Sequence, residues 1–74
     1  MENLDHILVF KTNISCEEKK QLLHTIFDTH SDIESWSIDM EDKDFVLRVV
    51  SYTLSQNEII EIINHHGYEC YELI

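Results

Sequence analysis

Two serines, each followed three residues later by a glutamate, most constrain what this chain can fold into. Ser15 with Glu18 and Ser55 with Glu58 match the capping box that opens a helix, one in each half of the sequence. Apolar residues at helical spacing follow both boxes, so we expect helices over Ser15–Thr29 and Ser55–His66. The single glycine, Gly67, then fits the left-handed position just beyond the second helix.

Four short apolar segments flank these helices and predict strands. His6 to Thr12 contains a continuous apolar run, whereas residues 33–40 and residues 45–50 alternate with a period of two. Tyr68 to Leu73 gives the last strand. Because only a charged turn separates the second strand from the third, we expect these two to form an antiparallel hairpin.

The order strand, helix, strand, strand, helix, strand predicts one α+β domain over residues 1–74. Each strand–helix–strand half should cross over right-handed. We therefore expect the ferredoxin-like βαββαβ sandwich, in which two helices cover one face of a four-stranded antiparallel sheet. The opposite face of the sheet would stay open.

Acidic residues dominate the charge of the chain, because 15 Asp and Glu face 5 Lys and Arg, for a net charge of -10. Phosphate groups and anionic lipid surfaces are bound by Lys and Arg, so we expect no nucleic acid partner and no membrane partner. No apolar run approaches the roughly 18 residues of a membrane span. The acidic, polar start, Met1–Asp5, is unlike a secretory signal, so we expect a cytoplasmic protein with free thiols.

Four stretches of the sequence resemble the heavy-metal-associated domain, the family of small copper chaperones and of the N-terminal modules of metal-pumping ATPases. They are Asn13 to Cys16, at the place of the family's Gly-Met-Thr-Cys turn, Asp32 to Met40, Phe45 to Val50, and Ile59 to Tyr68 with its closing Gly-Tyr pair. The resemblance covers nearly the whole chain and implies the same ferredoxin-like fold.

The metal motif departs from that family's Met-x-Cys-x-x-Cys pattern. Cys16 stands at the first cysteine, but Lys19 replaces the second cysteine and Ile14 replaces the methionine. Cuprous ion is soft and prefers two thiolates, which one thiol and one ammonium group do not supply. We therefore expect no cofactor and a binding or regulatory module that has lost the two-cysteine copper site.

Two other functions stay open at the same loop. In the first, a metal-binding or metal-transfer protein holds copper or zinc through Cys16, completed by His66, by His65, by a partner's thiol or by Cys16 of a second subunit. In the second, Cys16 is a thiol-reactive redox residue, since a helix N-terminus favours a thiolate. The residues expected to border the site are Ile14, Ser15, Lys19, Gly67 and Tyr68.

Other candidate residues are expected to have structural roles. We expect Cys70 and Trp36 in the core, and His6, His24 and His30 in solvent. The sequence has no glycine-rich phosphate loop, nucleophile elbow or metalloprotease motif, so we expect no enzyme.

The open face of the predicted sheet should be apolar. Alternation in the third strand predicts that Phe45, Leu47 and Val49 face the helices. The open face would then carry Val46, Arg48, Val50, Tyr71 and either Leu8 or Phe10. An exposed apolar patch of a few hundred Å² commonly marks a binding surface. We therefore expect a protein partner, or a weak homodimer, through this face.

Overall fold

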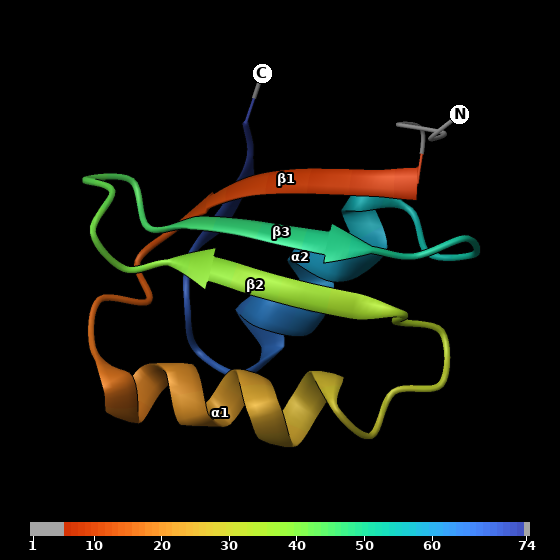
Figure 1. Cartoon of the computed structure of the whole chain (residues 1–74), viewed down its shortest axis with the longest axis horizontal. Coiled ribbons are helices and arrows are strands. Elements are labelled where there is room, and N and C mark those ends of the chain that lie inside the picture. Colours follow the sequence, from red (N-terminus) through yellow and green to blue (C-terminus); the bar gives the residue numbers. More distant parts are fainter. Residues whose placement is uncertain (1–5, 74) are drawn as a thin grey trace.

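The computed structural model describes residues 6–73, so the expectation for residues 1–5 lies outside the described residues. The elements, in chain order, are β1 (Ile7–Thr12), α1 (Glu17–Phe27), β2 (Ser35–Asp39), β3 (Val46–Val50), α2 (Gln56–His65) and β4 (Cys70–Glu72) (Figure 1). The predicted α+β class and element order are therefore confirmed for residues 6–73. Within this range, neither helix is long and apolar enough to cross a membrane.

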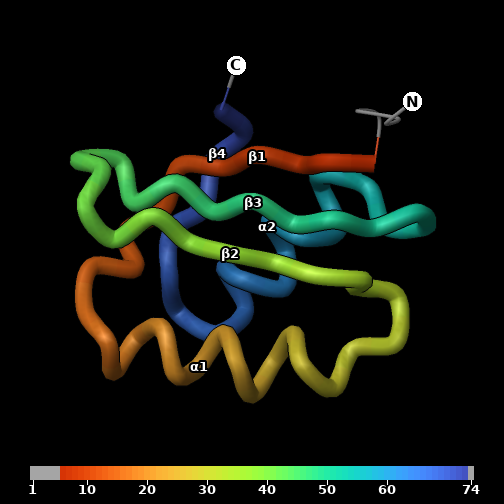
Figure 2. The backbone as a smooth tube through the Cα atoms, in the orientation of Figure 1, coloured from red at the N-terminus to blue at the C-terminus, as the bar shows by residue number. Residues whose placement is uncertain are grey.

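The four strands form one sheet in the order β2-β3-β1-β4, and each neighbouring pair is antiparallel. The hairpin predicted between β2 and β3 is confirmed, with Trp36 opposite Val49. β1 and β3 occupy the middle of the sheet, and β2 lies at the edge nearest α1 (Figure 2). The short strand β4 forms the other edge and places Cys70 opposite Thr12.

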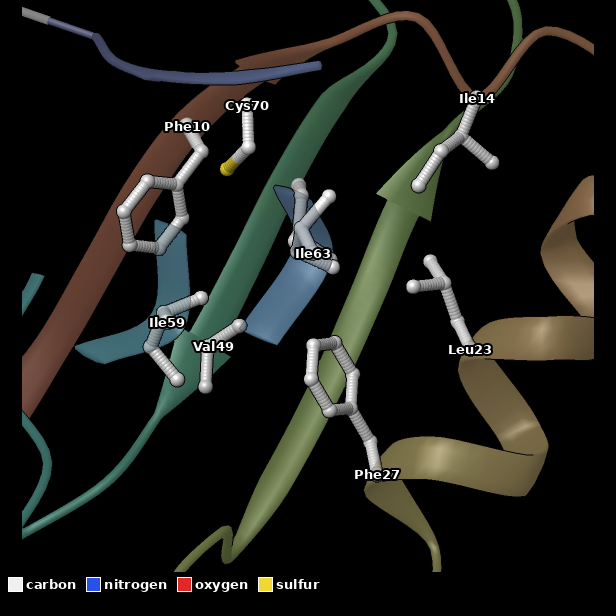
Figure 3. Packing of buried hydrophobic residues seen from close by; sticks show 9 residues of the cluster. Phe10, Ile14, Leu23, Phe27, Val49, Ile59, Ile63 and Cys70 are labelled. Carbon is white, nitrogen blue, oxygen red and sulfur yellow. The ribbon is translucent and has the colours of Figure 1, made fainter. Parts of the chain in front are cut away.

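One face of the sheet packs against both helices and forms the core (Figure 3). The fully buried cluster is Phe10, Ile14, Leu23, Phe27, Leu47, Val49, Ile59, Ile63 and Cys70. In each helix the two buried residues are four apart, Leu23 with Phe27 and Ile59 with Ile63, so they share one helical face. The predicted core position of Cys70 is confirmed, and Trp36 is half-buried against the cluster.

The side chains of β1 face the opposite way from the prediction. Phe10 lies opposite Leu47 and is fully buried, while Leu8 lies opposite Val49 and packs against the core. The prediction that Leu8 or Phe10 lies on the open face is therefore wrong. The apolar run of β1 does not alternate, so only its pairing register fixes which side chains face the helices.

The prediction that Phe45 starts the third strand and faces the helices is also wrong. Phe45 precedes β3, is half-buried, and adopts a left-handed backbone with φ of 44°, which is rare for a residue with a side chain. Its N–H donates to the carbonyl of Asp42 at 3.0 Å. The left-handed residue thus closes the turn of the β2–β3 hairpin.

The two predicted capping boxes have different outcomes. In α2, Ser55 is the N-cap and its Oγ accepts from the N–H of Glu58 at 3.2 Å. In α1 the N-cap is Cys16, whose side chain makes no capping hydrogen bond, while the Ser15 hydroxyl accepts from Lys19 Nζ at 3.2 Å. The predicted Ser15 cap is therefore wrong, and α1 begins one residue after Cys16.

Both helices end before their predicted last residues. The end of α2 is closed by Gly67, whose φ of 90° confirms the predicted left-handed position. The N–H of Gly67 donates to the carbonyl of Asn64 at 3.0 Å, and the N–H of Tyr68 donates to that of Ile63 at 3.3 Å. These two bonds form a Schellman motif, which satisfies carbonyls that the helix leaves free.

Because only Ser55 caps a helix, replacing Ser55 and Ser15 by alanine should change the free energy of unfolding by different amounts. Ser55→Ala removes the side-chain bond to the first turn of α2 and should lower the free energy of unfolding by about 0.5–2 kcal/mol. Ser15→Ala, the matched control, removes only an exposed contact with Lys19 and should leave stability nearly unchanged. Urea denaturation followed by far-UV circular dichroism measures both. Equal losses in the two variants would contradict this account of the helix N-termini.

Candidate functional site

The loop that carries Cys16, residues 13–16, is anchored in the core. Ile14 is fully buried and points toward Leu23 of α1 (Figure 3). The N–H of Ile14 donates to Thr12 Oγ1 at 3.2 Å, and that hydroxyl donates to the carbonyl of Phe45 at 2.8 Å. The loop is thereby fixed against both α1 and the β2–β3 hairpin.

A second contact ties the same loop to the connection between α2 and β4. The N–H of Asn13 donates to the carbonyl of Glu69 at 3.3 Å, and the N–H of Glu69 donates to Asn13 Oδ1 at 2.9 Å. Asn13 Nδ2 also donates to the carboxylate of Glu69 at 3.2 Å. The loop therefore lies beside Glu69, the residue that follows Tyr68.

The two cysteines have opposite environments. Cys16 is exposed at the start of α1, and its carbonyl accepts from the N–H of Lys20 at 3.0 Å, so its backbone is held while its thiol faces solvent. Cys70 is buried, and burial raises the pKa of its thiol to about 12. Cys16 is therefore the thiol that a soft metal ion or an alkylating reagent would reach in the folded chain.

His65 and His66 lie at the end of α2, in different surroundings from Cys16. The Nδ1 of His66 donates to the carbonyl of Ile62 at 2.9 Å, and the rings of the two histidines are 5.5 Å apart, edge to face. Both line a hollow of about 470 Å³ together with His30 and two glutamates of α2. Cys16 is not among the residues that line this hollow.

The predicted metal ligands are not gathered into a group. Across residues 6–73, no set of three or more His, Cys, Asp or Glu side chains is arranged to hold a metal ion. Lys19, three residues after Cys16, is turned to the hydroxyl of Ser15. The loop thus presents one thiol with an ammonium group close by in the first turn.

A cluster of three side chains between α1 and β2 was not predicted from the sequence. His24 Nδ1 lies 2.9 Å from one carboxylate oxygen of Asp28, and Trp36 Nε1 donates to the other oxygen at 2.9 Å. The His24 and Phe27 rings meet Trp36 edge to face, with centroids 4.8 and 5.7 Å away. The spacing of His24 in α1 and its C-cap residue Asp28, four positions apart, was the signal for their contact. His24 is therefore exposed, as predicted, and is also paired with Asp28.

The open face of the sheet carries Ile7 and Val9 of β1 in place of the predicted Leu8 or Phe10. Ile7, Val9 and Val50 lie on it and are half-buried, while Val46 faces the same way but is only 6% exposed. Arg48 is exposed between them. On β4, Tyr71 is 55% exposed and its hydroxyl donates to the carboxylate of Glu69 at 2.9 Å, which raises the pKa of Tyr71.

Comparison of the chain with protein-family models, with curated proteins and with solved structures found no match.

The Asp28 cluster predicts a specific dependence of stability on pH. The hydrogen bond from Trp36, and then that from His24, lower the pKa of the Asp28 carboxyl below its usual value of 3.8. A lowered pKa in the folded state stabilises the fold above the unfolded value, and this stabilisation is lost as the pH falls through the folded value. Asp28→Asn should therefore flatten the fall of the thermal midpoint below pH 3.8.

The measurement is a series of thermal unfolding curves on either side of that pH. The exposed carboxylate of Asp32 lies in the turn after α1, and Asp32→Asn serves as the matched control. The control should keep the acid dependence of the parent chain. An identical slope in the parent and in Asp28→Asn would show that the two hydrogen bonds to Asp28 do not distinguish the folded from the unfolded state.

Proposed function

We propose that the chain is a ferredoxin-like domain of the heavy-metal-associated type that acts as a binding or regulatory module. In this proposal the domain keeps the scaffold of that family and does not chelate cuprous ion by itself. The observation that carries the proposal is the Cys16 loop, where one exposed thiol stands on a fixed backbone and Lys19 occupies the place of the second ligand.

The order of the strands supports the ferredoxin-like part of the proposal. In the order β2-β3-β1-β4, β3 lies between the two strands that α1 connects, and β1 lies between the two strands that α2 connects. Each strand–helix–strand unit is thus split by a strand of the other unit. This interleaving is what the split βαβ arrangement requires.

The chemistry of the loop supports the loss of ordinary copper binding. Cuprous ion gains affinity from two soft thiolates held at fixed geometry, and this loop offers one. The second thiol of the chain, Cys70, is buried on β4 with a pKa of about 12 and belongs to the core. What the domain retains is a rigid surface loop tied to two neighbouring turns by Thr12 and Asn13.

Restoring the missing ligand tests this reading of the loop. The monomer should not retain cuprous ion against a strong chelator under anaerobic conditions. Lys19→Cys should create chelator-resistant binding of one ion, because residues three apart on a helix lie on the same side. Glu18→Cys, the matched control, adds a thiol two residues from Cys16, where it faces away, and should bind no more than the parent.

Competition titration with a coloured cuprous chelator provides the measurement, and Cys16→Ala in the Lys19→Cys background should abolish the new site. Stoichiometric binding by the parent monomer that Cys16→Ala removes would contradict the proposal. It would favour the second candidate function, a metal-transfer protein whose exposed Cys16 is completed by a thiol of a partner or of a second subunit.

The open sheet face is the proposed route to self-association. Ile7, Val9 and Val50 form its apolar centre, and each is half-buried within the monomer. Burial of such surface stabilises association by about 25 cal/mol per Å² before the cost of ordering two molecules. Two subunits of charge -10 repel each other, so we propose a weak homodimer that tightens as salt screens the repulsion.

Sedimentation velocity at low and high salt tests the homodimer. Val9→Lys places a charge at the apolar centre opposite Arg48 and should abolish the dimer. Asn57→Lys changes the net charge equally on an exposed part of α2 and should leave the dimer unchanged. A monomer at high protein concentration in both salt conditions would contradict self-association and favour a different protein as the partner of this face.

A further inference from the structure

The outer edge of β2 is the longest unpaired strand edge of the sheet. β2 has five residues, whereas β4, the strand at the other edge, has three. In the part of the chain that the structure describes, no strand pairs with β2 on the side away from β3. Every second residue of an antiparallel edge strand turns its N–H and C=O outward, where another chain can pair with them.

A groove runs beside this edge. α1 lies alongside β2 (Figure 1), and the space between them is a hollow of about 550 Å³, within the usual size range of binding pockets. Its walls are Lys20, His24 and Phe27 of α1 with the C-cap residue Asp28 on one side, and residues 33–38 on the other. Both the strand edge and a neighbouring wall of mixed polar and apolar side chains are therefore available to one bound segment.

The wall of the groove is formed before anything binds. The indole of Trp36 is fixed by its hydrogen bond to Asp28 and by ring contacts with His24 and Phe27. Ile38 packs against the core from the same side of β2. A preformed wall lowers the entropic cost of binding, because these side chains are already ordered.

β2 lacks three of the features that often protect an edge strand. Its sequence, Ser-Trp-Ser-Ile-Asp, contains no lysine and no proline, and its five residues pair one to one with β3 without a bulge. The unpaired edge and the hollow beside it together favour an extended segment as the occupant. Such a segment would pair with β2 through its main chain and send alternate side chains toward α1.

Charge identifies the kind of segment. The exposed carboxylates of Glu34 and Asp39 flank the edge at its two ends, and Lys20 is the only Lys or Arg among the residues that line the groove. Asp28 is already hydrogen-bonded to Trp36 and to His24. A second copy of this chain would bring the same acidic strand edge and the same net charge of -10, so the two copies would repel each other. A basic segment from another protein is complementary to this edge.

We propose that the groove between β2 and α1 binds an extended, basic segment of a partner protein by strand addition, with alternating apolar and Lys or Arg side chains. The apolar side chains enter the groove beside Trp36, and the basic ones turn to the opposite side of the added strand, near Asp39. This site is separate from the Cys16 loop and from the open sheet face, so its test is independent of the function proposed above.

The test uses the whole ¹⁵N-labelled chain and a synthetic five-residue peptide that alternates lysine and valine, with both ends blocked. Amide signals of residues 34–38 and of His24 should shift as the peptide is added, and the shifts should weaken as salt is raised. Methylating alternate backbone nitrogens of the peptide removes the donors of the new ladder and should weaken binding at least about tenfold.

Matched charge variants locate the site. Glu34→Lys should weaken binding of the lysine–valine peptide, because it places a repelling charge at the end of the strand edge. Glu61→Lys makes the same charge change on the exposed part of α2 and should bind as the parent does. Both substitutions are at exposed positions, and dispersed amide spectra establish that each variant is folded.

Four results would overturn the proposal. They are no shifts at residues 34–38 with the lysine–valine peptide, equal binding of a glutamate–valine peptide, equal binding of the N-methylated peptide, and concentration-dependent shifts at the same amides without peptide. The last result would identify a second copy of the chain as the occupant of the edge.

Discussion

A single buried hydroxyl, that of Thr12, holds together the end of the sheet where the candidate site lies. It donates to the carbonyl of Phe45 at 2.8 Å and accepts from the N–H of Ile14 at 3.2 Å. Thr12 is 6% exposed, so both of these polar neighbours are satisfied inside the protein and not by water. The position of Cys16 therefore depends on a side chain four residues earlier, in the last residue of β1.

The same hydroxyl explains why a strained residue is retained nearby. Phe45 has a positive φ, which costs free energy for any residue with a side chain. That conformation lets the hairpin offer two carbonyls to β1, because the N–H of Thr12 donates to Asp44 at 3.1 Å while its hydroxyl bonds to Phe45. The local cost is offset by bonds that join the hairpin to the central strand.

Much of the fold could be predicted from the sequence, because hydrophobic period and turn residues act locally. The element order, the hairpin, the cap at Ser55 and the left-handed Gly67 all depend on residues close in the chain. Which side chains of β1 face the helices could not be predicted, because its apolar run is continuous and only the pairing with β3 decides the side. Ser15 shows the same limit, because the sequence of its capping box is present but its hydroxyl bonds to Lys19. Cys16 occupies the N-cap position instead, without a side-chain capping bond.

Individual residues of the candidate site could be predicted from the sequence, but the contacts that bring distant segments together there could not. The place of Cys16 at the start of a helix, with Lys19 three residues later, is read directly from the sequence. The Asn13–Glu69 bonds join residues 56 positions apart, and no local pattern indicates them. The groove beside β2 likewise arises from how α1 sits against the sheet, where Asp28 and Trp36 meet across the turn.

The contrast between the two thiols allows the detachment of β4 from the sheet to be measured by chemical modification. Cys70 sits in β4, a three-residue edge strand, and is 2% exposed, so a reagent can reach it only while the strand is detached. Cys16 reacts from the closed state and gives the intrinsic rate on the same molecule. The ratio of the two modification rates, followed over time by mass, would measure the free energy of sub-global opening at this edge without denaturant.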